Sequence, residues 1–335
     1  MNKYFLLISS LIFLNPAFSQ KLKNDSIKIF IDKSIELIQS NSIHTENIPY
    51  IRQELYYKSQ NFQLLDSVAP MYVRVFELLK DHHGNLAYHG KSYGWQKVPS
   101  FRNAYLKEKL SHEKSVVSSV VDESVGYLRI PGNNDFAFKK VDSIANDIAS
   151  HVNKVNSEKI KAWILDLRLN TGGNMYPILL GLKEFIGEDI VFGGFRNAKN
   201  ESTGEWAVKD GKMLIDGIEL VRATSLALPL NKDISIVILT SCYTASAGEM
   251  TAISLIGCKD TYIVGEPTAG YTTAVQGFEI NESAGINLST DFVVDRNLNV
   301  YKDRIEPNFE VLLGDNLENL QDDKKIVQAL KLLKK

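Results

Sequence analysis

A serine stands where an apolar strand gives way to a helix, and this setting suits acyl transfer. Ile234 to Thr240 has the unbroken apolar character of a strand covered on both faces, and a helix is predicted to begin near Ser246. The small residues Ala245, Ala247 and Gly248 allow the backbone to turn sharply there. A hydroxyl at a helix start lies beside unpaired N–H groups, which is what a nucleophile with oxyanion donors requires. A serine in this place can also serve only as a helix cap.

A Gly-Gly turn upstream offers a second set of backbone donors. Ala162 to Leu167 is again an apolar strand, and it leads through Gly172 and Gly173 into an apolar helix, roughly Met175 to Ile186. Glycines permit close approach of the backbone to a bound group, and the turn opens a helix. Downstream, residues 265–270 read Gly-Glu-Pro-Thr-Ala-Gly.

These motifs, in this order, resemble the catalytic domain of the S41 peptidases. The matching runs are Asp-Leu-Arg-x-Asn-x-Gly-Gly from Asp166, Ser-Ala-Gly-Glu from Ser246 and the Gly-Glu-Pro-Thr-Ala-Gly run, and the resemblance covers about residues 68 to 312. The family includes the C-terminal processing proteases and the tricorn core protease. The resemblance implies a serine peptidase with Ser246 as nucleophile. It implies an oxyanion hole made by the N–H of Gly172 or Gly173 and that of Ala247.

The general base departs from the processing-protease pattern. Those enzymes carry a lysine in the loop after Gly-Glu-Pro-Thr, and here that position is Tyr271. Tyrosine is a poor base near pH 7 because its ordinary pKa is about 10. The tricorn-like branch uses histidine, and Leu-Lys-Asp-His-His-Gly resembles its Leu-x-Asp-x-His segment, which places the base at His83. His82 is the alternative, since a shift of one residue exchanges the two.

A glutamate near the C-terminus completes the predicted arrangement. Asp-Arg-Ile-Glu-Pro-Asn resembles the family's Gly-Ile-Glu-Pro-Asp segment, in which the glutamate belongs to the charge relay, and the match is Glu306. A carboxylate would orient the imidazole of His83 and stabilise its protonated form. Arg304 and Asn308 depart from the pattern, and His82 occupies the place of a serine in the tricorn-like relay.

The pattern of strands and helices around these residues indicates an α/β protein. Residues 20–110 are predicted to be a small helical N-terminal domain, with Ile27, Ile31, Ile35 and Ile38 on one helical face. Residues 111–335 alternate strands and helices, which favours a mostly parallel sheet with covering helices, and the resemblance implies a twisted sheet of the crotonase/ClpP type. The stretch between Asp81 and the first core strand is too short for a PDZ domain, so none is expected. A hairpin is expected over 286–301 and an amphipathic helix over 316–335.

Composition indicates the kind of core and partners that the protein has, and the N-terminal residues indicate its cellular compartment. Apolar residues make up 44% of 335 residues and the net charge is −2, which predicts a sizeable core and no nucleic-acid partner. Residues 1–19 read as a cleaved signal peptide, so we expect an exported protein, periplasmic or extracellular, without stable membrane insertion. Export permits a disulfide, but Cys242 and Cys258 are interpreted as two buried thiols. No metal-ligand spacing is present and no cofactor is implied.

Two other functions fit parts of the same sequence. Tyr271 in the lysine position is compatible with a catalytically inactive peptide- or ligand-binding protein. An acyl-CoA enzyme of crotonase fold shares Gly-rich oxyanion turns, although it needs neither Ser246 nor an export signal. The predicted substrate is a polypeptide; its specificity pockets are expected in loops that include residues 190–230, and the oligomeric state stays open.

Overall fold

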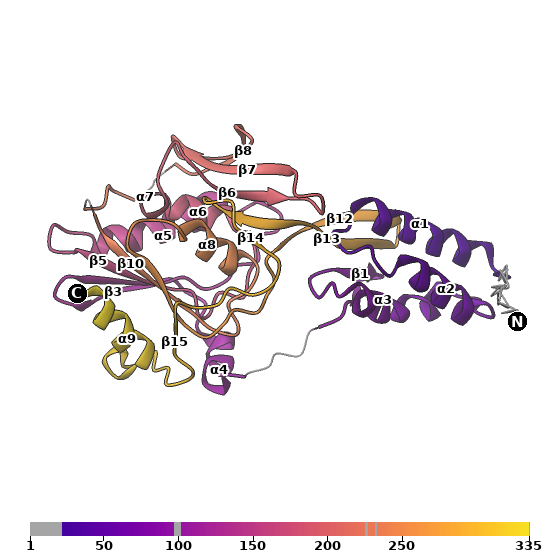
Figure 1. Ribbon diagram of the computed structural model, residues 1–335, viewed down its shortest axis with the longest axis horizontal. Helices are drawn as coiled ribbons and strands as arrows, with labels where there is room; N and C mark the ends of the chain where they lie inside the picture. The colour runs from indigo at the N-terminus through magenta and orange to yellow at the C-terminus, as the bar shows by residue number, and fades with distance from the viewer. Residues whose placement is uncertain (1–21, 97–101, 225–226, 232, 335) are drawn as a thin grey trace, which may run out of the picture.

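The N-terminal region is a helical unit built on a small hairpin (Figure 1). The computed structural model describes residues 22–96, 102–224, 227–231 and 233–334, so the predicted signal peptide lies outside the described residues. The unit contains α1 (Asp25–Asn41), α2 (Ile48–Ser59), α3 (Tyr72–Leu79), β1 (Asn85–Tyr88) and β2 (Lys91–Tyr93). Asn24 caps α1 by accepting hydrogen bonds from the N–H groups of Ser26 and Ile27. The predicted helices are present. The β1–β2 hairpin, which lies in the region predicted to be helical, was not predicted.

A six-stranded sheet forms the catalytic body, in the order β15-β11-β10-β5-β4-β3. All neighbours are parallel except β3 and β4, as the alternation of strands and helices predicts. The bounds are β3 (Val117–Asp122), β4 (Val125–Arg129), β5 (Ala162–Asp166), β10 (Ser235–Thr240), β11 (Thr261–Gly265) and β15 (Phe309–Glu310).

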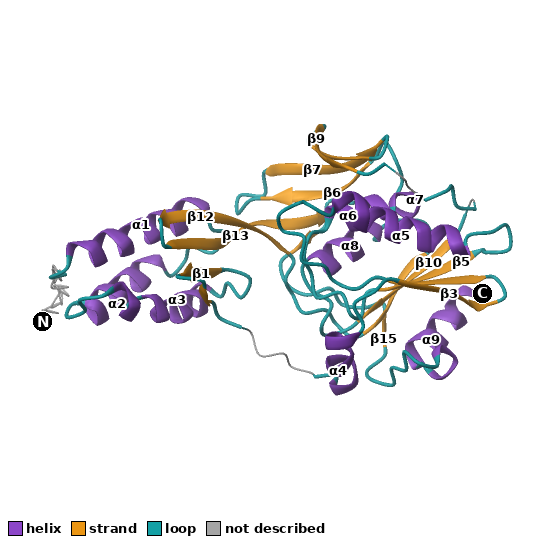
Figure 2. Ribbon diagram, turned by 180° about the vertical axis from the view of Figure 1, so that it is seen from behind, coloured by secondary structure: helices purple, strands orange, loops and turns teal. Residues whose placement is uncertain are grey.

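Helices cover both faces of this sheet, which explains why its strands are apolar throughout (Figure 2). Trp163 and Leu165 of β5 pack with α5, α6 and α8, whereas Ile164 faces α9. The covering helices are α5 (Val141–Val155), α6 (Tyr176–Gly181), α7 (Lys183–Ile186), α8 (Ala247–Leu255) and α9 (Lys324–Leu333); α4 (Ala104–His112) precedes β3. The C-terminal helix α9 is shorter than the expected 316–335, because a loop and a 3₁₀ turn occupy residues 316–323.

Most of residues 191–222 form strands, so the expectation of loops over 190–230 was wrong for this part. They supply β6 (Val191–Arg196), β7 (Ser202–Lys209), β8 (Lys212–Ile215) and β9 (Ile218–Arg222) to a second, antiparallel sheet. Asp210-Gly211 and Asp216-Gly217 make the two tight turns between β7, β8 and β9, with all four residues at positive φ. Asp-Gly is a strong hairpin signal, and it was present in the sequence.

One long hairpin joins the two regions. β12 (Thr273–Asn281) pairs with β13 (Ala284–Asp295), and the short strand β14 (Val300–Tyr301) returns along β13, which confirms the predicted hairpin. Figure 1 shows β12 and β13 running from the catalytic body to the N-terminal helices. Ile286 and Leu288 lie in the hydrophobic core of the N-terminal unit, whereas Val293 lies in the core of the catalytic body.

A buried ionic network holds the end of β5 against the C-terminal segment. Arg168 donates to Asp166, Asp315 and Asp323, with N–O distances of 2.6–2.9 Å. Lys325, also buried, donates to Glu266 at 2.9 Å and to both oxygens of Asp315. The network fixes the backbone that leads into the Gly-Gly turn. A further carboxylate contact comes from Asn103, which caps α4 and donates to Glu266 and Asp315.

We expect Lys325→Met to destabilise the fold strongly. Removing one member of a buried ion pair leaves the carboxylates of Glu266 and Asp315 less compensated, which costs about 3–5 kcal/mol. Lys331→Met, on the exposed face of the same helix, should stay within about 0.5 kcal/mol of wild type. Denaturant unfolding of both variants measures the difference, and equal midpoints would show that the network does not carry this stability.

Candidate active site

Ser246 occupies a strained turn between β10 and α8. Its φ is 50° and its ψ is −116°, a backbone conformation that residues other than glycine rarely adopt. Ala245 and Ala247 on either side are buried, whereas Ser246 is partly exposed. A sharp strand-to-helix turn of this kind presents a nucleophilic hydroxyl above the carboxyl edge of a parallel sheet, and strain there is typical of functional sites.

Glu249 ties this turn to the loop that follows β11. Its buried carboxylate accepts hydrogen bonds from the N–H of Ser246 at 2.9 Å, of Gly270 at 2.9 Å and of Tyr271 at 2.7 Å, and also from the hydroxyl of Thr268. Burial raises the pKa of Glu249 to about 7, against the opposing effect of these donors. These contacts give Glu249 a structural role.

The Gly-Gly turn lies directly against Ser246. A Cβ at Gly172 would lie 2.9 Å from the Cβ of Ser246, so only glycine allows this approach, and its φ of 112° also requires glycine. The N–H of Gly172 donates to Asn170 Oδ1 at 3.1 Å. Within the described ranges, no acceptor is bonded to the N–H of Gly173 or of Ala247. Backbone N–H groups without an acceptor are the kind of donor that a developing oxyanion needs.

The two histidines differ in how their rings are held. His82 Nε2 bonds to the carbonyl oxygen of Gly270 at 2.8 Å, which commits that nitrogen to the backbone. His83 instead uses Nδ1, at 2.9 Å from Thr273 Oγ1. Burial lowers the pKa of His83 to about 4, with a smaller opposing effect from Asp81. The imidazole of His83 is therefore neutral at neutral pH, the form that accepts a proton.

Tyr271 connects the serine turn with the imidazoles. Its N–H shares the Glu249 Oε2 acceptor with the N–H of Ser246. Its ring packs edge-on against both histidines, with centroid distances of 4.7 Å to His82 and 5.0 Å to His83. Burial raises the pKa of Tyr271, so even less of it than of an ordinary tyrosine is phenolate near pH 7, the form that could accept a proton.

Glu306 is not joined to these groups. Its side chain is 59% exposed and its carboxylate accepts from Arg304 Nε at 2.6 Å. The described residues contain no hydrogen bond between Glu306 and His83. The preceding residue, Ile305, is attached to the site through Thr268, whose hydroxyl oxygen accepts its N–H at 2.8 Å. The relay role of Glu306 stays a prediction.

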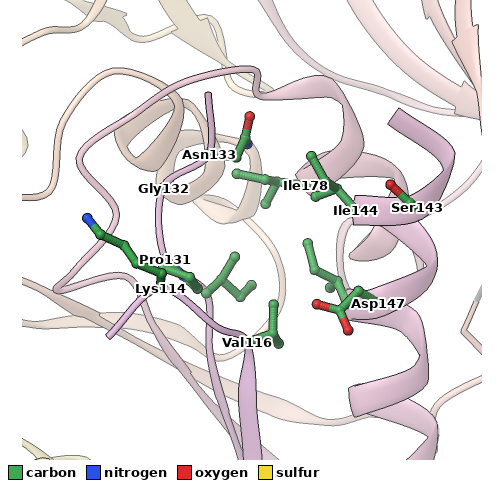
Figure 3. A pocket seen from close by; sticks show the side chains of 11 residues that line it. Lys114, Val116, Pro131, Gly132, Asn133, Ser143, Ile144, Asp147 and Ile178 are labelled. Carbon is green, nitrogen blue, oxygen red and sulfur yellow. The ribbon is translucent and has the colours of Figure 1, made fainter. Parts of the chain in front are cut away.

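A cavity of about 300 Å³ is lined by residues that include Gly132 and Asn133, which precede α5 (Figure 3). Its apolar walls come from Val116, Ile130, Pro131, Ile144, Ile148 and Ile178, with Lys114, Ser143 and Asp147 adding polar groups. Gly132 and Asn133, which also line it, contact the turn directly, since Asn133 N–H donates to the carbonyl oxygen of Gly172 at 3.0 Å. An apolar side chain would fit such a space.

The remaining predicted groups are placed as follows. Cys242 and Cys258 are free thiols, half-buried rather than fully buried, and burial raises the pKa of both. In the part of the chain that the structure describes, no group of His, Cys, Asp and Glu side chains has a metal-binding arrangement. None of the described helices has the length and apolarity needed to cross a bilayer.

The chain and its fold were compared with known proteins. The chain is 27% identical over 201 residues to the nisin-resistance protein of Lactococcus lactis subsp. lactis, a match covering 59% of this chain and 57% of that relative's length. The fold is similar to a lipoprotein from Streptococcus agalactiae (TM-score 0.67, 18% identity, 100% and 99% of the two chains). It is also similar to the photosystem II D1 C-terminal processing protease (TM-score 0.57, 10% identity, 89% and 96%).

Residues 124–311 match peptidase family S41. This match spans more than half of the chain and includes the Gly-Gly turn, the Ser246 elbow and the Glu306 segment. The mixed α/β architecture of S41 protease structures agrees with the fold described above. The chain therefore belongs to peptidase family S41.

Proposed function

We propose that this protein is an exported serine peptidase in which Ser246 is the nucleophile and His83 the general base. The proposal rests on the strained turn at Ser246, which the Gly-Gly turn contacts, and on the N–H groups of Gly173 and Ala247, to which no acceptor is bonded among the described residues. The neutral imidazole of His83 is linked to the same turn through Tyr271 and Glu249. Nucleophile, oxyanion donors and base are the parts that acyl transfer requires.

The reaction runs in two halves. Ser246 Oγ attacks the carbonyl carbon of the scissile peptide bond as its proton passes to His83 Nε2, and the oxyanion accepts from the N–H of Gly173 and Ala247. His83 then protonates the leaving amine, the C–N bond breaks and an ester on Ser246 remains. Water attacks this ester, gives a proton to His83, and the acid product leaves as the proton returns to Ser246.

Export is the second part of the proposal. Residues 1–19 have the sequence of a signal peptide, and the similar proteins include a lipoprotein and a nisin-resistance protein. The substrate is accordingly a polypeptide outside the cytoplasm. The N-terminal residue of protein isolated from cells tests cleavage after Ser19, and an intact Met1 would contradict it.

An inactive binding protein is the second candidate, because Tyr271 replaces the lysine of the processing proteases. Labelling by a serine-directed fluorophosphonate separates the two, since only an activated serine reacts.

We predict that Ser246→Ala abolishes both peptide hydrolysis and fluorophosphonate labelling while the protein stays folded. Ser246→Gly should be equally inactive but more stable than the alanine variant by about 1–3 kcal/mol, because glycine adopts a φ of 50° without strain. Turnover assays and denaturant unfolding measure the two effects. Retained turnover in either variant, with the other serines intact, would remove Ser246 from the mechanism.

The lowered pKa of His83 changes the expected pH dependence of the activity. An ordinary histidine would place the acid limb of kcat/KM near 6.5, whereas the lowered pKa of His83 places it near pH 4. The same shift makes His83 stabilise the fold above pH 6.5, and this contribution is lost as pH falls through about 4.

Two substitutions complete this test. His83→Ala should remove activity at every pH and also the acid-dependent part of the stability, whereas Tyr271→Phe should leave much of the activity and the same acid limb. An acid limb near 6.5, or an active His83→Ala enzyme, would show that another group is the base.

The cavity beside the Gly-Gly turn is proposed to hold an apolar side chain of the substrate. Ile144→Trp should fill it and raise KM for peptides with large apolar residues near the cleaved bond, with little change in the rate at which a small fluorophosphonate labels Ser246. Unchanged KM values over a set of peptides with large and small residues would place the substrate elsewhere.

A further inference from the structure

A line of hydroxyl groups runs from His83 to a buried carboxylate. His83 Nδ1 lies 2.9 Å from Thr273 Oγ1, which lies 3.0 Å from Ser289 Oγ. The hydroxyl of Ser289 donates to Asp81 Oδ1 at 2.7 Å. Thr273 is on β12 and Ser289 on the neighbouring strand β13, next to an irregularity in their pairing. Asp81 follows α3, two residues before His83.

The carboxylate fixes the direction of every hydrogen bond in this line. Asp81, when ionised, only accepts, so the one proton of Ser289 Oγ points to it. Thr273 must then donate its own proton to Ser289 Oγ. The remaining contact requires Thr273 Oγ1 to accept, and its donor is the Nδ1–H of His83. The imidazole is thereby held in the tautomer that leaves the lone pair on Nε2.

We propose that Asp81 is the positioning residue of this active site and acts on His83 through Ser289 and Thr273. It sets the tautomer in which Nε2 takes the proton of Ser246, and its charge favours the imidazolium that forms. This rests on the proposed role of His83 as base. A carboxylate bonded directly to the imidazole does the same in other serine proteases; here two hydroxyls transmit the effect.

The surroundings of Asp81 are those of a fixed carboxylate. It is 1% exposed, and it also accepts from the N–H groups of His83 at 3.1 Å, Gly84 at 2.8 Å and Ser289 at 3.0 Å. A Cβ at Gly84 would lie 2.6 Å from Asp81 Oδ2, so no larger residue fits there. Its negative charge partly offsets the effect of burial on the pKa of His83. Glu306, by contrast, is exposed and bonded to Arg304.

The hydroxyl of Thr273 gives the sharpest activity test, because Asp81 also holds backbone groups and its removal would disturb them. Thr273→Val keeps the shape and breaks the line, and kcat should fall by about 10²-fold with little change in KM. Thr273→Ser restores the hydroxyl and should return kcat close to wild type. Thr290→Val is the matched control. Thr290 is, like Thr273, a buried threonine of this hairpin, but it lies on β13 and its hydroxyl bonds to Asp291. A wild-type kcat in Thr273→Val would overturn the proposal.

The tautomer itself can be read without any activity. In protein labelled with ¹⁵N-histidine at neutral pH, the His83 signals, assigned with a His83→Gln sample, should show a protonated Nδ1 and an unprotonated Nε2. Thr273→Val and Ser289→Ala should shift this balance towards Nε2–H, whereas Glu306→Gln and Thr290→Val should not. A protonated Nε2 in wild type, or a response to Glu306→Gln, would overturn the role of Asp81.

The two measurements separate this proposal from the proposed function. If Ser246→Ala retains turnover, the peptidase mechanism fails, and the ¹⁵N signals still decide whether Asp81 sets the tautomer. If Ser246 is the nucleophile but the tautomer is Nε2–H, only the role of Asp81 fails.

Discussion

The carboxylate of Glu249 is the constraint on which the site depends. A non-glycine residue at φ 50° persists only where its surroundings over-determine it, and Glu249 supplies that constraint by accepting the N–H of Ser246. The same oxygen accepts the N–H of Tyr271, and the other carboxylate oxygen accepts from Thr268 and Gly270. One buried side chain therefore fixes the serine turn and the loop that contacts both histidines. Its position in the first turn of α8 also suits the positive end of the helix dipole.

The two residues of the proposed catalytic pair belong to parts of the chain that have separate hydrophobic cores. Ser246 belongs to the catalytic body, whereas His83 follows α3 of the N-terminal unit. The β12–β13 hairpin contributes side chains to both cores, and it also carries Thr273 and Ser289. The distance between nucleophile and base thus depends on a hairpin whose two ends are packed in different cores. In the proposed mechanism, the helical unit therefore contributes the general base.

The sequence predicted the parts of the site that arise from local pattern. Apolar runs identify β5 and β10, and small residues after them identify the two turns, because both signals are confined to neighbouring residues. Residues brought together by pairing of distant strands were missed: Thr273 and Ser289 are ordinary strand residues until β12 and β13 place them beside Asp81. The choice between Gly172 and Gly173 depended on the side chain of Asn170. The shifted pKa of His83 depended on burial, which no motif records.

A crystal structure of the protein after reaction with a small fluorophosphonate would show which residue is the nucleophile. We expect a phosphorus–oxygen bond to Ser246 Oγ, with one phosphonyl oxygen within hydrogen-bond distance of the N–H of both Gly173 and Ala247, and His83 Nε2 facing Ser246 Oγ. An adduct on another residue, or a phosphonyl oxygen turned away from these two N–H groups, would contradict the proposed mechanism.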